Sequence, residues 1–460
     1  MALPPAFLAA LGDLPRTDDP ALVKQKSRDF YWYSPVLKRQ LRDVTGDLLV
    51  QVRSEADIIH VLKTAYAHDV PVTVRGAGTG NYGQAMPLKG GVVLDVSGLE
   101  AVRWVKPGAV RCEPGIKMLA LDDVLAASGQ EMRFFPSTRR TATLGGFIAG
   151  GSGGIGSIAW GLLRDPGNIL GVRVVTMEAE PRILELRGAD IQKVNHAYGT
   201  NGVITEVEMP TTEAVAWREM VITFPDLMAA SRAAMAVGAA DGIAKKLVSV
   251  IAAPIPEQHF KGLRDHIPAG HSVMLAMVAP SSVEATALVV SDQGGRVAFE
   301  AGPGGDVPLY EYSWNHTTLQ ALKTDKGVTY LQVLFPQPHA LDLVQRLAAE
   351  FGDEVVTHLE FVRFHGQVTC VGLPLVRFTS EARLGEIVHA FEAAGCPVFD
   401  PHTYTLEEGG MKAIDQVHLA FKRDADPKGL LNPGKMIAWD DPNWTPARAQ
   451  SVHLYAAGPA

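Results

Sequence analysis

The chain has 460 residues, of which 47% are hydrophobic and 20% are charged, and this composition predicts a folded protein of two or three domains. Its 42 Lys and Arg residues are outnumbered by 50 Asp and Glu residues, and the net charge of −8 comes with no basic cluster. Binding to nucleic acid is therefore not expected, because it requires clustered positive charge. The three cysteines, Cys112, Cys370 and Cys396, are too widely spaced for a disulfide framework or a metal knuckle.

The first twenty residues contain no basic segment, and Pro4 and Pro5 interrupt their short apolar run. We therefore expect no signal peptide. No stretch approaches the roughly 18 apolar residues that a membrane-spanning helix needs. These features, and a cysteine content typical of a reducing compartment, predict a cytoplasmic protein without a membrane span.

The first part of the chain alternates helical and β-branched patterns. Apolar residues recur at helical spacing over 54–69, and Ser54 is placed to cap that helix. Short β-branched runs follow, and they predict strands at 70–74, 91–96, 172–177 and 203–209. Strands that alternate with helices indicate an α/β or α+β unit.

From about residue 213 the glycine content falls and Ala-rich helix patterns appear, notably over 340–353 and 380–395. They alternate with strand patterns over 328–335 and 358–373, so we predict a second α+β domain. The chain then reaches DPKGLLNPGKM (426–436), which Pro and Gly mark as the end of a helix.

The predicted strand at 70–74 runs directly into the glycine-rich loop RGAGTGNYG (75–83). Glycines allow backbone N–H groups to converge on an anion. A nicotinamide-binding fingerprint, with Asp95 as the ribose-binding acid, would require a helix after the loop. A proline and a second strand follow instead, so we keep that interpretation only as a minor alternative.

A second glycine-rich segment, TLGGFIAGGSGGIG (143–156), contains seven glycines. Its GGSGG part matches the nucleophile elbow of hydrolases, with Ser152 as the nucleophile, but an elbow needs a strand before it and a helix behind it. So many glycines indicate a backbone that lies close against a flat or anionic ligand. A large cofactor fits this pattern better than a catalytic serine does.

Together these segments resemble the FAD-binding oxidoreductases of the vanillyl-alcohol oxidase type, also called the PCMH-type or FAD-linked oxidase family. RGAGTGNYG resembles the family's pyrophosphate loop, and FFPSTRRTATLGGFIAGGSGG resembles its second flavin segment. AYGTNGVITEVEMPTT (197–212) resembles the stretch that closes the flavin domain, and DPKGLLNPGKM resembles the C-terminal signature. The four segments occur in the family's order and bracket most of the chain.

By this resemblance, the first loop would hold the pyrophosphate, the second segment would lie along the flavin, Ile204 would lie by the adenine, and the C-terminal signature would reach the ring system. The residues implied are Arg75, Gly76, Ala77, Gly78, Thr79, Gly80, Asn81, Tyr82, Pro136, Ser137, Thr143, Gly145, Gly146, Ile148, Ala149, Gly153, Ile204, Asn432 and Lys435. Ile148 and Ile204 could equally be core residues. Since 75–91 and 136–156 contain neither His nor Cys, we expect FAD to be bound non-covalently.

Oxidation of an alcohol by a flavin needs a base for the hydroxyl proton and donors for the substrate's polar end. Relatives that oxidise D-2-hydroxy acids carry the metal-binding pattern H-x-G-D-G-N-x-H, whereas this chain has FHGQVTC (364–370) at the corresponding strand and no second histidine at that spacing. We therefore expect no metal.

Three segments supply candidates for the chemistry. His316 is the first choice for the base, with His402 and Tyr404 as further catalytic candidates. Each could instead be an ordinary structural residue. The candidates for substrate binding are Asn315, Arg363, His365 and Arg377. Arg363 and His365 would share one strand face, which could look at substrate or at water.

We thus predict an α+β fold in which a PCMH-type FAD-binding domain of two α+β subdomains is joined to a substrate domain with an antiparallel sheet and flanking helices. The expected parts are an N-terminal arm (1–40), the FAD-binding domain (41–212), the substrate domain (213–400) and a segment that returns to the FAD-binding domain (401–460). The expected function is oxidation of a hydroxyl-bearing carbon of a small molecule by hydride transfer to FAD, with O₂ or another electron acceptor.

Two alternatives remain open. One is a metal-free D-2-hydroxy-acid dehydrogenase acting on substrates such as lactate or glycolate. The other is a non-catalytic flavin subunit that relays electrons within a complex. The chain could form a homodimer or be a subunit of a larger oxidoreductase.

Overall fold

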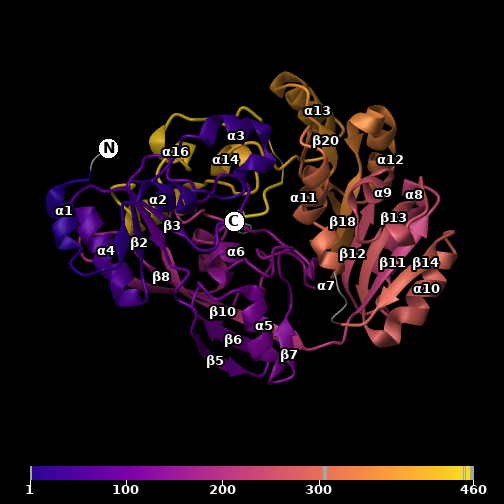
Figure 1. The fold of residues 1–460 in the computed structure, drawn as a ribbon, viewed down its shortest axis with the longest axis horizontal. Coiled ribbons are helices and arrows are strands. Elements are labelled where there is room, and N and C mark those ends of the chain that lie inside the picture. Colours follow the sequence, from indigo (N-terminus) through magenta and orange to yellow (C-terminus); the bar gives the residue numbers. More distant parts are fainter. Residues whose placement is uncertain (1–2, 304–307, 449, 451, 456–460) are drawn as a thin grey trace.

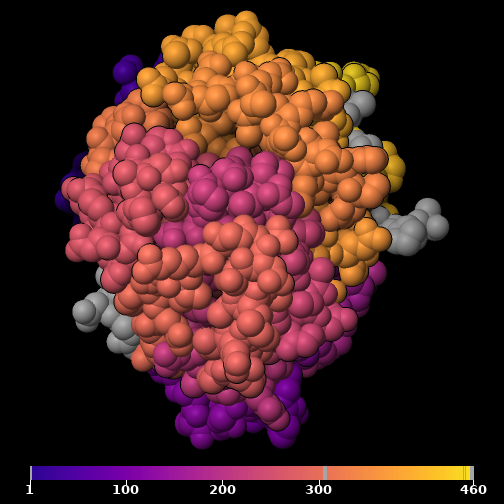
Figure 2. Space-filling view, turned by 90° about the vertical axis from the view of Figure 1, so that its right-hand side faces the viewer, coloured from indigo at the N-terminus to yellow at the C-terminus, as the bar shows by residue number. Residues whose placement is uncertain are grey.

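The computed structural model describes residues 3–303, 308–448, 450 and 452–455. Figure 1 shows two small sheets and their helices on one side of the molecule and a larger sheet with its helices on the other. Viewed from that second side, residues of the second half of the chain cover almost the whole face (Figure 2). The fold is α+β, as the sequence predicts.

The first sheet has the strand order β1-β2-β4-β3, in which β2, β4 and β3 run parallel and β1 is antiparallel. The three parallel strands are mostly apolar and mostly buried on both faces, as is typical of parallel strands. The elements are β1 (Arg16–Thr17), β2 (Leu48–Gln51), β3 (Val72–Arg75) and β4 (Val92–Asp95), with helices α1 (Pro5–Ala10), α2 (Pro20–Lys26), α3 (Pro35–Leu41) and α4 (Glu55–Ala67).

Helix α4 begins where the sequence predicts. Ser54 Oγ accepts a hydrogen bond from the Asp57 amide at 3.1 Å, and Asp57 Oδ2 accepts one from the Ser54 amide at 3.0 Å. This reciprocal capping box satisfies two N–H groups that the helix itself leaves free. The strands predicted at 70–74 and 91–96 are confirmed as β3 and β4.

The second sheet has the order β5-β6-β10-β8-β9, and β7 pairs with the far end of β10. The long central strand β10 and its neighbour β8 confirm the strands predicted at 203–209 and 172–177. The elements are β5 (Val102–Lys106), β6 (Ala109–Cys112), β7 (Gln130–Met132), β8 (Gly171–Val175), β9 (Ile183–Leu186) and β10 (Val203–Glu213), with helices α5 (Met118–Ala126), α6 (Leu144–Gly150) and α7 (Ser157–Trp160).

The third sheet is antiparallel throughout, with the order β14-β11-β13-β12-β18-β19-β16. Its strands are β11 (Arg218–Phe224), β12 (Lys245–Ile251), β13 (Ser272–Val278), β14 (Arg296–Ala301), β16 (Val333–Phe335), β18 (His358–Phe364) and β19 (Gln367–Gly372). A small sheet beside it contains β15 (Val328–Tyr330), β20 (Leu375–Arg377) and β17 (Val355–Val356).

The two faces of the third sheet have different partners. One face packs on α8 (Leu227–Ala239), α12 (Ala340–Phe351) and α13 (Glu381–Ala393) in a large apolar core. The opposite face contributes Leu247, Met277 and Leu334 to a core shared with the first half of the chain. The remaining helices of this half are α9 (Ile255–His259), α10 (Val283–Ser291) and α11 (Asn315–Thr324).

Two strand predictions in this half were wrong in extent. The pattern at 358–373 forms a hairpin rather than one strand, because His365 and Gly366 adopt positive φ angles of 49° and 79° and turn the chain. The pattern at 328–335 is divided between β15 and β16, which belong to different sheets.

After α13 the chain returns to the first half through α14 (Leu406–Gly409), α15 (Gln416–Ala425) and α16 (Ile437–Asp440). Leu431 forms a bridge with Val72 of β3, and the Asn432 amide donates to the Val72 carbonyl at 2.8 Å. The domain boundaries near 212 and 401 remain a prediction. Among the described residues, no helix is both long enough and apolar enough to cross a membrane.

Candidate functional site

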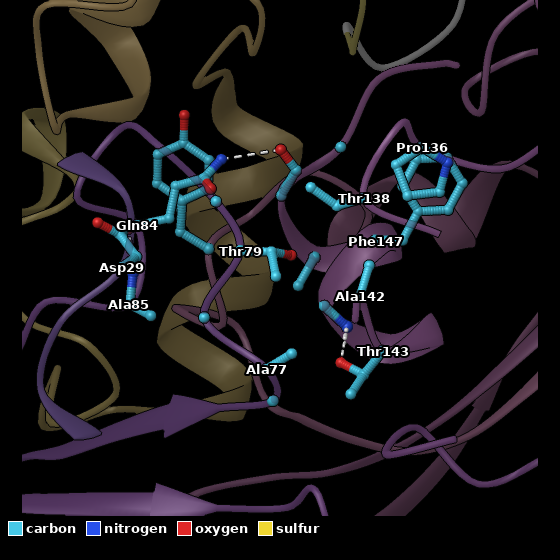
Figure 3. Close-up of a pocket in the computed structure, with 18 of the residues that line it drawn as sticks. Asp29, Ala77, Thr79, Gln84, Ala85, Pro136, Thr138, Ala142, Thr143 and Phe147 are labelled. Carbon is cyan, nitrogen blue, oxygen red and sulfur yellow. Dashed lines mark hydrogen bonds between the residues drawn. The ribbon is translucent and has the colours of Figure 1, made fainter. Parts of the chain in front are cut away.

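A cavity lies where the two glycine-rich segments meet the second half of the chain. The space open to the centres of water molecules inside it is about 210 Å³. Its walls come from residues 76–85, 136–154 and 194–204, from the N-terminal arm and from residues 314–316 of the substrate-domain region. In Figure 3, Ala77 and Thr79 of the first segment lie between Asp29, Gln84 and Ala85 on one side and Pro136, Thr138 and Thr143 on the other.

The first segment follows β3 and leads into β4, so no helix begins at its end. The glycines allow its backbone to lie against neighbouring side chains: a Cβ on Gly76 would be 2.2 Å from Thr143 Oγ1, and one on Gly80 would be 2.0 Å from Gln84 Oε1. Gly78 has a φ of +68°, which glycine adopts readily. The loop thus presents backbone, rather than side chains, to the cavity.

The second segment contains helix α6, which Thr143 caps by accepting a hydrogen bond from the Gly146 amide at 3.4 Å (Figure 3). Beyond the helix, a Cβ on Gly154 would be 2.2 Å from the Phe135 carbonyl oxygen, so the chain has room only for glycine here. Helix α6, and not a strand, precedes Ser152. The geometry of a hydrolase elbow is therefore not formed at this serine.

The structure brings most of the predicted cofactor residues to the cavity wall. The wall includes Gly76, Ala77, Gly78, Thr79, Gly80, Asn81, Tyr82, Pro136, Ser137, Thr143, Gly145, Gly146, Ala149, Gly153 and Ile204. Four predicted residues do not line it. The Arg75 guanidinium donates to the backbone carbonyls of Lys26, Arg28 and Ala77 instead, and Ile148 is a fully buried core residue.

The other two, Asn432 and Lys435, lie behind the first loop. Asn432 Nδ2 donates to the Gln84 carbonyl at 2.8 Å, and Lys435 Nζ donates to the Gly83 carbonyl at 2.6 Å. These two residues therefore fix the backbone of the loop from outside the cavity.

The N-terminal arm and the second half of the chain hold the same loop. The Phe30 amide donates to the Gly80 carbonyl at 2.7 Å, and Asn81 Nδ2 donates to the Tyr330 hydroxyl at 2.7 Å. Asp29 is buried in the cavity wall, where desolvation raises its pKa to about 6 against the opposing charge of Lys435. Burial conversely lowers the pKa of Lys435 to about 7.

Asn315 and His316 begin helix α11 and line the cavity. His316 is buried, and its Nδ1 lies 2.9 Å from Glu311 Oε2. Burial alone would raise the pKa of Glu311, but the nearby His316 imidazole brings it below its ordinary value. An acid that orients an imidazole whose ring faces a cavity is a typical arrangement for a general base.

The structure does not bring the other two catalytic candidates to the cavity wall. His402 is buried between Ser34 and Tyr330, with Nδ1 2.8 Å from Ser34 Oγ and Nε2 2.9 Å from the Tyr330 carbonyl oxygen. Both ring nitrogens thus have partners, and burial lowers its pKa. Tyr404 packs beside Leu41 and Met86, and the Lys435 ammonium lies 5.1 Å from its ring centre.

Three substrate-binding candidates also lie away from the wall. Arg363 contacts Asp241 at 3.4 Å, His365 lies in the exposed hairpin turn, and Arg377 is exposed at the end of β20. The β18 face with Phe361 and Arg363 is the one turned toward the helices. Within the described ranges, His, Cys, Asp and Glu form no group of three that could hold a metal ion.

Several residues of the cavity wall were not predicted from the sequence. They are Asp29, Phe30, Tyr33, Gln84, Tyr198, Asn201, Trp314 and Gln332. The aromatic density of the arm was a signal for the first three, but it is equally typical of core packing. Tyr198 and Asn201 belong to the AYGTNG stretch, whose motif did draw attention to this part of the chain.

Comparison with known proteins agrees with this geometry. The FAD binding domain family matches residues 46–185. The glycolate oxidase subunit GlcD of Escherichia coli is 26% identical over 432 residues, covering 85% of this chain and 83% of its own. The mitochondrial D-lactate dehydrogenase [cytochrome] of Arabidopsis thaliana is 25% identical, with 85% of this chain and 73% of its own covered.

Residues 46–185 thus form an FAD binding domain, and the chain as a whole is similar to FAD-linked oxidases and dehydrogenases of the PCMH type. A solved structure of alkyldihydroxyacetonephosphate synthase has the same fold, with a TM-score of 0.72 and 17% identity over 94% of this chain and 85% of that one. The match to an FAD binding domain supports FAD as the cofactor, and these relatives are named as an oxidase subunit and a dehydrogenase.

The residues of the cavity fit FAD. The glycines at 76, 80 and 154 let the backbone pack closely against Thr143, Gln84 and Phe135, so that glycine backbone lines the cavity, as suits the phosphates of a dinucleotide. Apolar side chains such as Val194 and Ile204 suit an adenine, and polar and aromatic groups from the second half of the chain suit a flavin ring and a substrate.

Lys412 binds the backbone of the segment that contains the wall residue Val194, and its burial leads to a prediction for stability. Its Nζ donates to the carbonyls of Gln192 and Asn195, the latter at 2.8 Å, and burial lowers its pKa from 10.5 to about 7. Between pH 7 and 10.5 the unfolded chain binds the proton that the folded chain releases, so this residue's contribution to stability rises with pH.

We expect the difference in unfolding free energy between wild type and Lys412→Met to grow with pH over this range, by up to about 1.4 kcal/mol per pH unit. Chemical denaturation at a series of pH values measures it. Lys24→Met, at an exposed position of α2, is the matched control. A flat profile for Lys412→Met would contradict the prediction.

Proposed function

We propose that the protein oxidises a hydroxyl-bearing carbon of a small organic substrate, with His316 as the base that takes the hydroxyl proton. The observation that carries this proposal is the Glu311–His316 contact of 2.9 Å at a cavity whose other walls are the two glycine segments. When FAD is bound there, it supplies the hydride acceptor.

We assign roles to the residues at the start of helix α11 and to the neighbouring Glu311. Glu311 orients the His316 ring and stabilises its positive charge after proton uptake, which is the usual effect of a carboxylate beside a catalytic imidazole. The environment of the Tyr82 hydroxyl includes the side chains of Asn315, Gln332 and Tyr330. We assign Asn315 to hydrogen bonding of the substrate's polar end, because it lines the cavity next to His316.

D-2-hydroxy acids are the substrate class that the relatives favour. Besides the glycolate oxidase subunit and D-lactate dehydrogenase, the mitochondrial D-2-hydroxyglutarate dehydrogenase of Bos taurus is 24% identical over 452 residues. All three names describe oxidation of a carbon that carries a hydroxyl next to a carboxylate. We propose this class as the first to test.

The test is anaerobic mixing of FAD-loaded protein with D-lactate, glycolate, D-2-hydroxyglutarate and a set of neutral alcohols. We expect the flavin absorption near 450 nm to bleach with at least one compound, as is general for a flavin that accepts a hydride. The absence of bleaching by every compound would overturn the catalytic proposal.

A second candidate, a flavin subunit of a larger oxidoreductase, is favoured by the name of the GlcD relatives. This role predicts tight FAD binding, no bleaching by hydroxy compounds alone, and a stable partner after affinity purification from the native source. Bleaching by a substrate in the isolated protein would instead favour an independent enzyme.

A further inference from the structure

The backbone of Trp314 has a conformation that residues other than glycine rarely adopt. Its φ is +50° and its ψ is −141°, at the position that immediately precedes helix α11. Such strain persists only where the surrounding structure imposes it, and it often occurs at functional sites. Two residues that the strained position presents, Asn315 and His316, line the cavity with Trp314 itself.

The group that holds this conformation is Glu360 on strand β18. Glu360 Oε1 accepts a hydrogen bond from the Trp314 amide at 2.6 Å and one from Ser249 Oγ at 2.8 Å, and His358 Nε2 lies 2.7 Å away. Glu360 is 1% exposed and His358 is fully buried. The other carboxylate oxygen, Oε2, is buried without a hydrogen-bond partner among the described residues.

The hydrogen bonds of the Glu360 carboxylate are all made by one of its two oxygens. A buried carboxylate normally distributes its hydrogen bonds over both oxygens, because each buried lone pair without a donor has a cost. Here all three contacts gather on the oxygen beside Trp314. A hydrogen bond to a carboxylate is stronger than one to a neutral acceptor, which suits a bond that must resist backbone strain.

Trp314 connects this cluster to the flavin segment. A Cβ built on Gly153 would lie 3.5 Å from Trp314 Cη2, so the far edge of the indole lies beside the second glycine segment. The indole also packs on the apolar core shared by the two halves of the chain. The position of one backbone amide therefore sets both the indole at Gly153 and the start of α11.

We propose that Glu360 is a positioning residue: by holding the Trp314 amide it fixes the indole against the flavin segment and aims Asn315 and His316 into the cavity. This inference rests on the proposed function, in which His316 is the base. It adds that part of the site is set from β18, by a residue that does not line the cavity.

The test compares Glu360→Met, which keeps the volume but removes the acceptor, with Glu360→Gln, whose amide oxygen can still accept from the Trp314 amide. Ser249→Ala is the matched control, because it removes another donor to the same oxygen and leaves the Trp314 bond. The measurements on FAD-loaded protein are the visible circular dichroism of the bound flavin, the FAD dissociation constant and the substrate dependence of flavin reduction.

We expect Glu360→Met to change the flavin circular dichroism and to lower the limiting rate of flavin reduction at least tenfold, with less than a threefold change in the FAD dissociation constant. Glu360→Gln and Ser249→Ala should stay close to wild type. Unchanged circular dichroism and rate in Glu360→Met would overturn the proposal. If no hydroxy compound reduces the wild-type flavin, the proposed function fails, and the circular dichroism still decides the role of Glu360.

A double variant separates this role from general packing. Glycine adopts a φ near +50° without help, so in a Trp314→Gly background the further change Glu360→Met should leave the flavin circular dichroism unaltered. If Glu360→Met alone does not fold, the double variant should recover folded, FAD-loaded protein. An equal effect of Glu360→Met in both backgrounds, or failure of the double variant to recover, would contradict the proposal.

Discussion

Replacement of His316 by alanine is expected to slow reduction of the bound flavin by substrate by a factor of about 10²–10⁴, which is the usual contribution of a general base. The ring nitrogen Nδ1 is 2.9 Å from Glu311, and the residue lines the cavity, so its loss removes the group that we assign to the hydroxyl proton. Anaerobic stopped-flow absorption measures the rate, and FAD content and dissociation constant should change little.

A variant of the neighbouring acid adds a second readout. Glu311→Gln should lower the rate less than His316→Ala, since the imidazole remains. His339→Ala is the matched control, because His339 is 72% exposed on its side chain. A His316→Ala variant with the wild-type rate would exclude His316 as the base.

The second large effect is expected for Gly154→Ala. Its Cβ would lie 2.2 Å from the Phe135 carbonyl oxygen and 2.8 Å from the Phe135 carbonyl carbon. Backbone cannot rotate away as a flexible side chain can, so the paired segments must separate. Phe135 and Ile155 exchange two hydrogen bonds of 2.9 and 3.0 Å here, and the displacement would move the glycine segment that lines the cavity.

Overpacking of this kind costs about 1–3 kcal/mol, which corresponds to a roughly 5- to 150-fold weaker affinity if the strain falls on the cofactor site. The measurement is the FAD dissociation constant, from the quenching of FAD fluorescence on binding. Gly385→Ala is the control, because nothing lies within 4 Å of a Cβ there and helix α13 tolerates it. Equal FAD affinity in both variants would show that the wall at Gly154 adapts.

Sequence patterns predicted the α+β fold and the glycine cradle because both follow from local constraints. Helix α4 begins at the Ser54 capping box, and Gly154 lies so close to the Phe135 carbonyl group that a Cβ does not fit there. The two strand predictions that failed in extent, at 328–335 and 358–373, depended on turns. Gly366 was a turn signal that the strand pattern outweighed, whereas nothing in the sequence indicates the positive φ of His365 itself.

The catalytic candidates were harder to predict, because their placement depends on tertiary packing. His316 and His402 are similar in sequence context, each beside a polar and aromatic stretch. Only the packed structure shows that His316 lines the cavity and contacts Glu311. Both ring nitrogens of His402 are instead hydrogen-bonded, one to Ser34 and the other to Tyr330. Glu360 lies on strand β18, where the alternation of polar and apolar residues pointed to the other face, which carries Arg363.

The loop over residues 80–85 is held by hydrogen bonds from the N-terminal arm, from Tyr330 and from Asn432 and Lys435 near the C-terminal end. During synthesis, a nascent chain that has just left the ribosome with both glycine motifs lacks the last three of these contacts. Capture of the cofactor is thus expected to be a late event, after the segment with Asn432 and Lys435 has folded back. In a cell, a shortage of FAD would accordingly affect nearly complete chains rather than early fragments.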